Sequence, residues 1–464
     1  MKGYKENDFT MIYGFPGRTQ EYLSSYGVDV LVNDIDPRRV ELRDIKLKIL
    51  EKYMRQSDDL NLKYASVYAS VANYYKKWKG EMIGLKKVDA VRKKRTFEEN
   101  LKQNLKDKSS ALDSFNMVMK AFSEVYPSYR YYQMQADYFQ ECFMAIDAIK
   151  YIGNYVDFFT EYNRMKMGME HQLDKIKLQL SKSIPYSFHL PADKEIFIAL
   201  MSYYFDHVQE KDRVPFLDSL YKKFNNDVQK MADFLYANSL FLNNDRLKEI
   251  LQTTDDERIK DFENDVFFRL VQSIKLYFYS QVLSNLKETD ARITDVQKMF
   301  IKLIIDYDKS KKYYPDANST LRVAFGKVKK YEPRDGVRYN YFTTGNGILE
   351  KQNNESKDYY VDDTLRTLFI KKDFGKYADK DGELHVAFIA SNHTTGGNSG
   401  SPVFNANGEL IGINFDRCWE GTMSDVMYNP EICRNIMLDV RYVLFLIDKY
   451  AKRDWIIKEM KIVY

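Results

Sequence analysis

A serine near the C-terminal end of the sequence is flanked by glycines. The segment reads Thr394-Thr395-Gly396-Gly397-Asn398-Ser399-Gly400-Ser401-Pro402-Val403. Glycines let the backbone take a tight turn that exposes the Ser399 hydroxyl, and they allow the amides of Gly397 and Ser399 to point at one spot, as an oxyanion hole requires. The segment therefore predicts nucleophilic catalysis by Ser399. The alternative is an ordinary glycine-rich hairpin loop, because short motifs of this kind also arise by chance.

A serine nucleophile needs a general base with a third group behind it. The sequence has five histidines, which are His171, His189, His207, His385 and His393. The first three fall in a region that reads as helical, and the last two come shortly before Ser399. His393 is near enough in sequence to approach the hydroxyl, but local residues in such a loop more often orient the turn. We expect His393 to shape the loop.

The segments around Ser399 read as antiparallel strands. Short apolar runs at Val386–Ala390 and Leu410–Phe415 are bounded by turn signals such as Asn407-Gly408. Residues Phe9–Tyr13 alternate in the same way near the N-terminus, and Val28–Val32 is a second apolar run that we expect to be a strand. Two strands alone cannot form a domain, so they must pair with strands elsewhere.

A long helical region separates these strand segments. Asp36-Pro37 is a good helix start, and from there to about Tyr313 the chain is rich in Lys, Glu, Leu, Met and Tyr with few glycines or prolines. Stretches such as Ile196–Phe205 and Val266–Val282 have apolar positions three and four apart. At the C-terminus one amphipathic helix is expected to carry Ile436, Val440, Leu444, Ile447 and Ala451.

These patterns predict an α+β protein in which a β domain is interrupted by a large helical insertion. The expected divisions are residues 1–36 for a first β segment of that domain, 37–320 for the inserted helical domain, and 321–464 for a C-terminal β-barrel with the nucleophile loop and a closing helix. At 464 residues the chain is long enough for two or three domains.

Composition excludes several functional classes. The chain has 71 basic and 67 acidic residues, and its net charge of +4 gives no reason to expect a nucleic-acid partner. No apolar stretch approaches the ~20 residues of a membrane span. The three cysteines, Cys142, Cys418 and Cys433, lack the close paired spacing of a zinc site, and we expect neither a metal nor a cofactor. Cys418 and Cys433 could form a disulfide or remain thiols, and the sequence does not decide.

The Gly-Asn-Ser-Gly-Ser-Pro core resembles the nucleophile loop of chymotrypsin-fold serine peptidases. The longer segment from Asn392 to Asp425 resembles the bacterial dipeptidyl-peptidase family that contains dipeptidyl-peptidases 7 and 11. Further matching segments are Gly14–Thr19, Ala72–Lys77 and Tyr331–Val337. The resemblance implies a double β-barrel with an inserted helical domain, and a triad in the order His, Asp, Ser. The histidine and aspartate come from the N-terminal barrel in that family, and this chain is expected to begin after most of that barrel.

The same resemblance assigns residues to the substrate. Asp416 and Asn73 match positions that hold the free α-amino group of the substrate, and Phe415 is expected to line the same pocket. The position of Arg417 is glycine in relatives that prefer hydrophobic residues and arginine in those that prefer acidic ones. A guanidinium can bind a carboxylate through two parallel hydrogen bonds. The alternative is that Arg417 pairs internally with Glu420 or Asp425.

The resemblance therefore predicts a periplasmic serine dipeptidyl peptidase that releases N-terminal dipeptides ending in Asp or Glu through an acyl-enzyme at Ser399. Its partners are peptides with a free N-terminus, and a homodimer is one expected state. The chain alone is expected to be inactive, because the triad histidine and aspartate are not found in it. The alternatives are a peptide-binding protein that has lost the base, and a helical interaction protein with a β scaffold.

Overall fold

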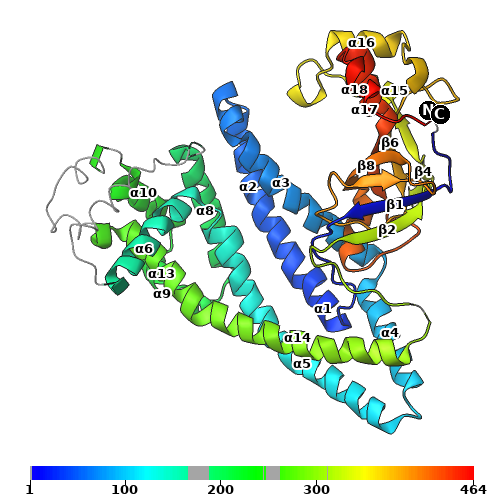
Figure 1. The fold of residues 1–464 in the computed structure, drawn as a ribbon. Coiled ribbons are helices and arrows are strands. Elements are labelled where there is room, and N and C mark those ends of the chain that lie inside the picture. The colour runs from blue at the N-terminus through cyan, green and yellow to red at the C-terminus, as the bar shows by residue number, and fades with distance from the viewer. Residues whose placement is uncertain are drawn as a thin grey trace. The chain divides into compact units, whose positions relative to one another are not determined.

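A computed structural model of the chain describes residues 3–165, 186, 188–243, 245–246, 262–310 and 312–463. These residues form two compact units (Figure 1). The first unit, called the β unit here, comprises Met1–Val28, Gly80–Glu99 and Asp308–Tyr464. The second, called the helical unit, comprises Asp29–Lys79 and Asn100–Tyr307. The domain boundaries predicted at residues 36 and 320 remain a prediction. His171 lies outside the described residues.

Helices make up most of the region between the two strand-forming parts of the chain. The α-helices are α1 (Ser25–Val30), α2 (Asp36–Met54), α3 (Asp58–Lys87), α4 (Ala90–Asn104), α5 (Ser109–Asp137), α6 (Asp147–Met165), α8 (Leu190–His207), α9 (Pro215–Lys223), α10 (Val228–Asn238), α13 (Val266–Tyr277) and α14 (Ser284–Tyr307). Wider π-helical turns occur at η1 (Leu31–Ile35), η2 (Tyr138–Phe143) and η5 (Phe278–Leu283), and short 3-10 turns occur at η3 (Glu210–Asp212) and η4 (Leu240–Leu242).

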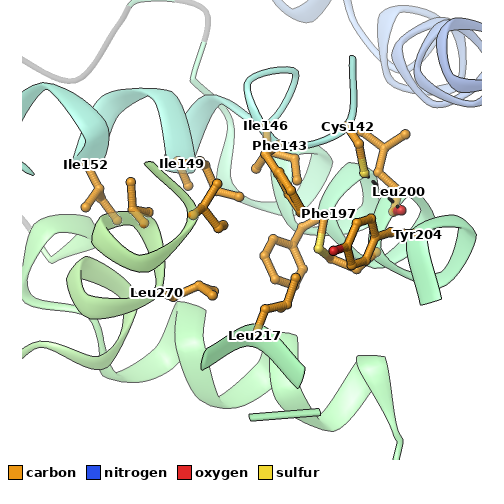
Figure 2. Close-up of a cluster of buried hydrophobic side chains, with 14 of the residues drawn as sticks. Cys142, Phe143, Ile146, Ile149, Ile152, Phe197, Leu200, Tyr204, Leu217 and Leu270 are labelled. Carbon is orange, nitrogen blue, oxygen red and sulfur yellow. Dashed lines mark hydrogen bonds between the residues drawn. The ribbon is translucent and has the colours of Figure 1, made fainter. Parts of the chain in front are cut away.

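The helical unit is held together by a large apolar core. Side chains spaced three and four apart on α8 are at most 1% exposed, as Phe197, Leu200 and Tyr204 illustrate. They meet residues of α6 and α13, including Ile149 and Leu270 (Figure 2). The periodic stretches Ile196–Phe205 and Val266–Val282 are confirmed as helical, with α13 passing into η5.

The β unit contains a seven-stranded antiparallel sheet in the order β2-β1-β7-β8-β9-β6-β5 and a separate β3-β4 hairpin (Figure 1). The strands are β1 (Phe9–Gly14), β2 (Arg322–Lys327), β3 (Tyr331–Arg334), β4 (Val337–Tyr339), β5 (Phe342–Thr344), β6 (His385–Ala390), β7 (Pro402–Phe404), β8 (Leu410–Arg417) and β9 (Asn435–Asp439). The unit's remaining helices are α15 (Gly345–Lys351), α16 (Asp363–Ile370), α17 (Val440–Phe445) and α18 (Asp454–Lys458), with turns η6 (Lys357–Tyr359), η7 (Gly375–Tyr377), η8 (Trp419–Asp425) and η9 (Leu446–Tyr450).

The β2 edge of the sheet approaches β6, the strand next to the opposite edge. Val328 forms an antiparallel bridge with Ala390, and the Ser391 amide donates to the Lys327 carbonyl at 3.0 Å. The end of β2 thus pairs with the end of β6, although β2 and β6 lie far apart in the strand order. Ile12 and Val403 are fully buried inside this arrangement.

The strands predicted at Phe9–Tyr13, Val386–Ala390 and Leu410–Phe415 are confirmed as β1, β6 and β8. The strand predicted at Val28–Val32 is wrong, because this run belongs to α1 and η1. Val28, Val30 and Val32 of this run are buried, as is Ile35 after it, so the run is buried on more than one face of the helix and its burial alone shows no simple period. The helix therefore begins before Asp36-Pro37. Proline has no N–H to donate within a helix, and the chain accommodates Pro37 with the π-helical turn η1 just before it.

The closing helix predicted from Ile436 to Ala451 is partly wrong. Ile436 lies in β9, where it pairs with Ile389 of β6. The helix begins at Val440, because the Asp439 side chain accepts a hydrogen bond from the Arg441 amide at 2.8 Å and caps the first turn. In the described part of the chain, no helix is both long and apolar enough to cross a membrane.

Candidate functional site

The Ser399 loop connects β6 to β7 and holds the serine at an exposed position. The Ser399 Oγ donates to the Phe415 carbonyl at 3.2 Å. The amides of Asn398, Gly400 and Ser401 donate to backbone carbonyls. In the described part of the chain, the backbone N–H groups of Gly397 and Ser399 donate to no acceptor. The loop thus presents a hydroxyl and two unpaired N–H groups.

Two glycine contacts fix the shape of this loop. Gly397 has φ +104°, a conformation that residues with a Cβ rarely adopt, and a Cβ there would collide with the Phe15 carbonyl. The Gly17 amide donates to the Gly396 carbonyl at 2.7 Å. The segment that follows β1 therefore packs directly on the Ser399 loop.

Buried asparagines anchor the loop to the sheet. The Asn414 amide nitrogen donates to the Asn398 carbonyl at 3.1 Å, and its Oδ1 accepts from the Asn435 side chain at 2.8 Å. At the start of the loop, Asn392 Oδ1 accepts from the Thr10 hydroxyl at 2.7 Å. All of these side chains are buried. Sequence reasoning missed them, because only the fold shows that asparagines on β8 and β9 face the loop.

Arg417 is the last residue of β8 and follows Phe415, whose carbonyl accepts from Ser399, by two residues. Two residues along a strand span roughly 7 Å. Its Nη1 lies 2.6 Å from Asp425 Oδ1 and donates to the Ser424 hydroxyl at 2.8 Å and to the Thr394 carbonyl at 3.4 Å. The side chains of Arg417 and Asp425 are only 14% and 12% exposed. The internal pair considered from the sequence therefore exists, and Asp425 is the partner.

The other predicted substrate residues are exposed. Phe415 is 46% exposed and lies where the β8–β9 register shifts between Asn414 and Asp416, at a β-bulge that redirects side chains. Asp416 Oδ1 accepts from the Arg417 amide at 2.7 Å. The structure thus brings Ser399, Phe415, Asp416 and Arg417 together.

Asn73 is exposed on α3, within the helical unit. Its role in holding the substrate amine stays a prediction.

The histidines before Ser399 have other partners. His393 Nε2 lies 2.8 Å from the Ser424 carbonyl, so this nitrogen carries the proton, and Nδ1 lies 3.4 Å from the Tyr314 hydroxyl. His385 is buried between Asp379 and Asp381. In the described part of the chain, no histidine bonds the Ser399 hydroxyl.

Burial keeps the tyrosines around His393 neutral. It raises the pKa of Tyr428 to about 12 and the pKa of Tyr314 well above its ordinary value, with the charge of Glu21 adding to the shift at Tyr314. The Tyr428 hydroxyl donates to the Ser391 carbonyl at 2.6 Å. Cys418 and Cys433 are free thiols, and burial raises the pKa of Cys418 to about 11. These groups support the loop and carry no activated nucleophile.

The comparison with known proteins covers almost the whole chain. Residues 1–462 match the peptidase S46 family. An Asp/Glu-specific dipeptidyl-peptidase of Capnocytophaga gingivalis is 38% identical over 475 residues, which cover 100% of this chain and 64% of that protein. Dipeptidyl-peptidase 7 of Porphyromonas gingivalis is 32% identical, again over 100% of this chain and 64% of that protein.

Solved structures agree with the sequence comparison. DPP11 of Porphyromonas endodontalis in complex with the dipeptide Arg-Asp matches with a TM-score of 0.88 at 29% identity, covering 99% of this chain and 65% of that one. The same protein in complex with Arg-Glu matches with a TM-score of 0.86. The chain thus spans slightly less than two thirds of the length of these relatives. It shares with them a mainly helical α+β fold with an antiparallel sheet, and it belongs to the peptidase S46 family.

Proposed function

We propose that this chain carries the nucleophile and the side-chain pocket of a serine dipeptidyl peptidase that releases N-terminal dipeptides ending in Asp or Glu. One observation carries the proposal. The Ser399 hydroxyl contacts the carbonyl of Phe415, and a guanidinium follows two residues later on the same strand. Relatives named for Asp/Glu specificity and a relative with bound Arg-Asp support an acidic ligand.

The chemistry follows from the loop. The Ser399 hydroxyl would attack the carbonyl carbon of the second residue of the peptide and give its proton to a general base, and the oxyanion would accept hydrogen bonds from the amides of Gly397 and Ser399. The bond to the third residue would then break, its amine would leave with that proton, and the dipeptide would remain as an ester on Ser399 until water hydrolyses it. Those two amides have no other acceptor in the described residues, which supports this role. The Arg417 guanidinium would bind the acidic side chain before the scissile bond.

The sheet that carries this loop is proposed to be a chymotrypsin-like barrel. The bridge between Val328 and Ala390 links the β2 end of the strand order to β6, which favours a closed ring of β2, β1, β7, β8, β9 and β6. The periplasmic location and the homodimer stay predictions.

Equilibrium binding tests the acidic preference without requiring turnover. Isothermal titration of the 464-residue chain with Arg-Asp and with its neutral isostere Arg-Asn should show at least about tenfold tighter binding of Arg-Asp. Arg417→Gly should remove the difference. Arg338→Gly, which removes an exposed arginine paired with Glu332, is the control and should keep it. Equal affinity for both dipeptides in the unmodified chain would refute the proposal.

Asp416 and Asn73 are proposed to recognise the α-amino group. N-acetylation removes both the charge and the hydrogen-bond donors of the amine, so acetylated Arg-Asp should bind at least about tenfold more weakly than the free dipeptide. Asp416→Asn should reduce that difference. Equal binding of free and acetylated peptide would remove the amine clamp from the proposal.

A second candidate function is peptide binding without hydrolysis. It is favoured by the partners of His393 and His385, which leave the Ser399 hydroxyl without a histidine among the described residues. A peptide-binding protein would show the Arg-Asp preference but no turnover that depends on Ser399, even when the N-terminal barrel of a relative supplies a triad histidine and aspartate.

A further inference from the structure

The guanidinium of Arg417 has two edges in different surroundings. On one edge, Nη1 is held by Asp425, by the Ser424 hydroxyl and by the Thr394 carbonyl, and Nη2 makes a longer contact of 3.4 Å to Asp425 Oδ2. Arginine has five N–H groups in a rigid planar arrangement. Within the described ranges, no acceptor takes the Nε–H of Arg417 or the second N–H of Nη2.

The remaining edge is the one that suits a carboxylate. Nε–H and the outer Nη2–H are parallel donors, which match the two oxygens of a carboxylate. Asp425 occupies the Nη1 side, so the internal ion pair and a substrate carboxylate do not need the same two N–H groups. The internal pair and recognition of an acidic substrate are therefore compatible.

The two residues that hold Arg417 are themselves held through their backbone. The Ser424 carbonyl lies 2.8 Å from His393 Nε2, and the Asp425 carbonyl accepts from the Gln20 amide at 2.6 Å. Both residues are buried at the end of η8.

Helix α3 packs against η8. The β-unit part of α3 meets η8 through Gly84, where a Cβ would come within 3.0 Å of the Met423 side chain. Close packing therefore fixes η8, and η8 in turn fixes Asp425.

We propose that Asp425 and Ser424 are positioning residues for substrate specificity, which fix the Arg417 guanidinium so that its Nε–Nη2 edge faces the acidic side chain of the substrate. This inference rests on the proposed function of Arg417. An arginine side chain loses rotamer freedom when it binds a ligand, and a side chain that is already fixed loses less on binding. The partner carboxylate thus increases selectivity although it carries the same charge as the ligand.

The test separates positioning from charge. Asp425→Ala removes the acceptors for Nη1, and it should lower the Arg-Asp to Arg-Asn affinity ratio by about tenfold. Asp425→Asn removes the charge but keeps one oxygen for Nη1, and it should keep the ratio within about threefold of the unmodified chain. Ser424→Ala should lower the ratio by about threefold, because one of several contacts is lost. Titration calorimetry gives all of these ratios from one pair of dipeptides.

A matched ion pair in the helical unit supplies the control. Arg213 and Asp218 are 3.1 Å apart and are 17% and 12% exposed, close to the values for Arg417 and Asp425. Asp218→Ala should lower thermal stability to a similar extent while leaving the affinity ratio unchanged. If Asp425→Ala does not fold, Ser424→Ala still tests the inference, because an unchanged affinity ratio in folded Ser424→Ala would overturn the positioning role.

The outcomes distinguish this inference from the proposed function. An unchanged or larger ratio in Asp425→Ala, while Arg417→Gly abolishes the preference, would overturn the positioning role alone. A larger ratio in Asp425→Asn would mean that Asp425 competes with the substrate, and this too would overturn it. No preference for Arg-Asp in the unmodified chain would refute the proposed function and this inference together.

Discussion

Among the described residues, the β unit buries a larger share of polar and charged side chains than the helical unit does. In the helical unit the core is mainly apolar and aromatic (Figure 2). Phe197, for example, packs edge to face against Tyr236 and Phe267. In the β unit the largest fully buried side chain is Arg434, which donates to backbone carbonyls such as those of Lys329 and Pro430. A core of the first kind tolerates changes of shape better than changes of polarity, whereas one of the second kind depends on each partner.

This difference separates stability from chemistry. Apolar packing is not directional, so it can stabilise many arrangements of similar volume. Hydrogen-bonded networks fix individual atoms, which is what a nucleophile loop and a specificity residue require. Substitutions in the helical unit should therefore change stability, and those in the β unit should change function at a smaller cost in stability.

The largest expected effect concerns catalysis in the β unit. In the part of the chain that the structure describes, no histidine bonds the Ser399 hydroxyl. A serine without a general base keeps only the small catalysis that comes from binding and the oxyanion hole, roughly six powers of ten below an intact triad. The 464-residue chain should therefore hydrolyse an Asp-ending fluorogenic dipeptidyl substrate no faster than its Ser399→Ala variant. Initial rates at matched concentration measure this. Turnover that depends on Ser399 would contradict this prediction, and His393 would again be a candidate for the general base.

The next effect is on stability in the helical unit. Phe197→Ala removes a fully buried ring from α8 and leaves a cavity, and it should lower the free energy of unfolding by about 3–5 kcal/mol. Leu276→Ala on α13 is the control, because this side chain is 66% exposed and should change stability by less than ~0.5 kcal/mol. Urea unfolding gives both values. If folded Phe197→Ala had a changed ratio of Arg-Asp to Arg-Asn affinity, substitutions in the helical unit would affect function as well as stability, which contradicts the comparison.

Asp193 makes the helical unit sensitive to pH. Burial, and then the charge of Asp147, raises the pKa of Asp193 to about 6, although its carboxylate accepts hydrogen bonds from the Tyr236 hydroxyl and the Asp147 amide. Between pH 4 and 6 the folded state binds more protons at this site than the unfolded state. Stability should therefore fall as pH rises through this window, by up to about 3 kcal/mol.

Urea unfolding of the unmodified chain at pH 4, 5, 6 and 7 measures this slope. Asp193→Asn should flatten it, because the substituted side chain does not titrate, while lowering stability overall, because an amide nitrogen cannot accept the bonds that the carboxylate accepts. The same slope in both proteins would assign the pH dependence to other groups.

The smallest effect tests the polar network of the β unit. Asn414→Ala leaves the Asn435 amide and the Asn398 carbonyl without this partner, at a cost of about 1–3 kcal/mol. Asn435→Ala should cost a similar amount. The double variant should cost clearly less than the sum, because the two side chains share one hydrogen bond. Additive costs would mean that the asparagines act independently and that the β unit resembles the helical unit.

The sequence predicts many of the helices through periodicity and a candidate site through a motif. Apolar spacing located α8 and α13, and alternation located β1, but the run Val28–Val32 was too short to distinguish a buried strand from a helix. The glycines around Ser399 identified the loop. Periodicity carries no information about polar pairs, so the roles of Asn414 and Asn435 required the strand register.

Arg417 shows a different limit of sequence reasoning. From the sequence, recognition of a ligand and internal pairing with Asp425 are alternatives for Arg417, because a sequence does not show which N–H groups of a guanidinium an internal partner occupies. The geometry makes the two compatible, since Asp425 lies on the Nη1 side.

The glycines that bring the β1 turn against the nucleophile loop constrain the evolution of the chain. A Cβ on Gly14 would collide with the side chains of Ser401 and Asn398, and one on Gly397 would collide with the Phe15 carbonyl. A Cβ on Gly347 would meet nothing within 4 Å. Positions 14 and 397 are distant in sequence but belong to one interface. Among functional descendants of this chain, we expect both to stay glycine while position 347 varies freely, so the pair records selection for the loop even where the surrounding sequence has diverged.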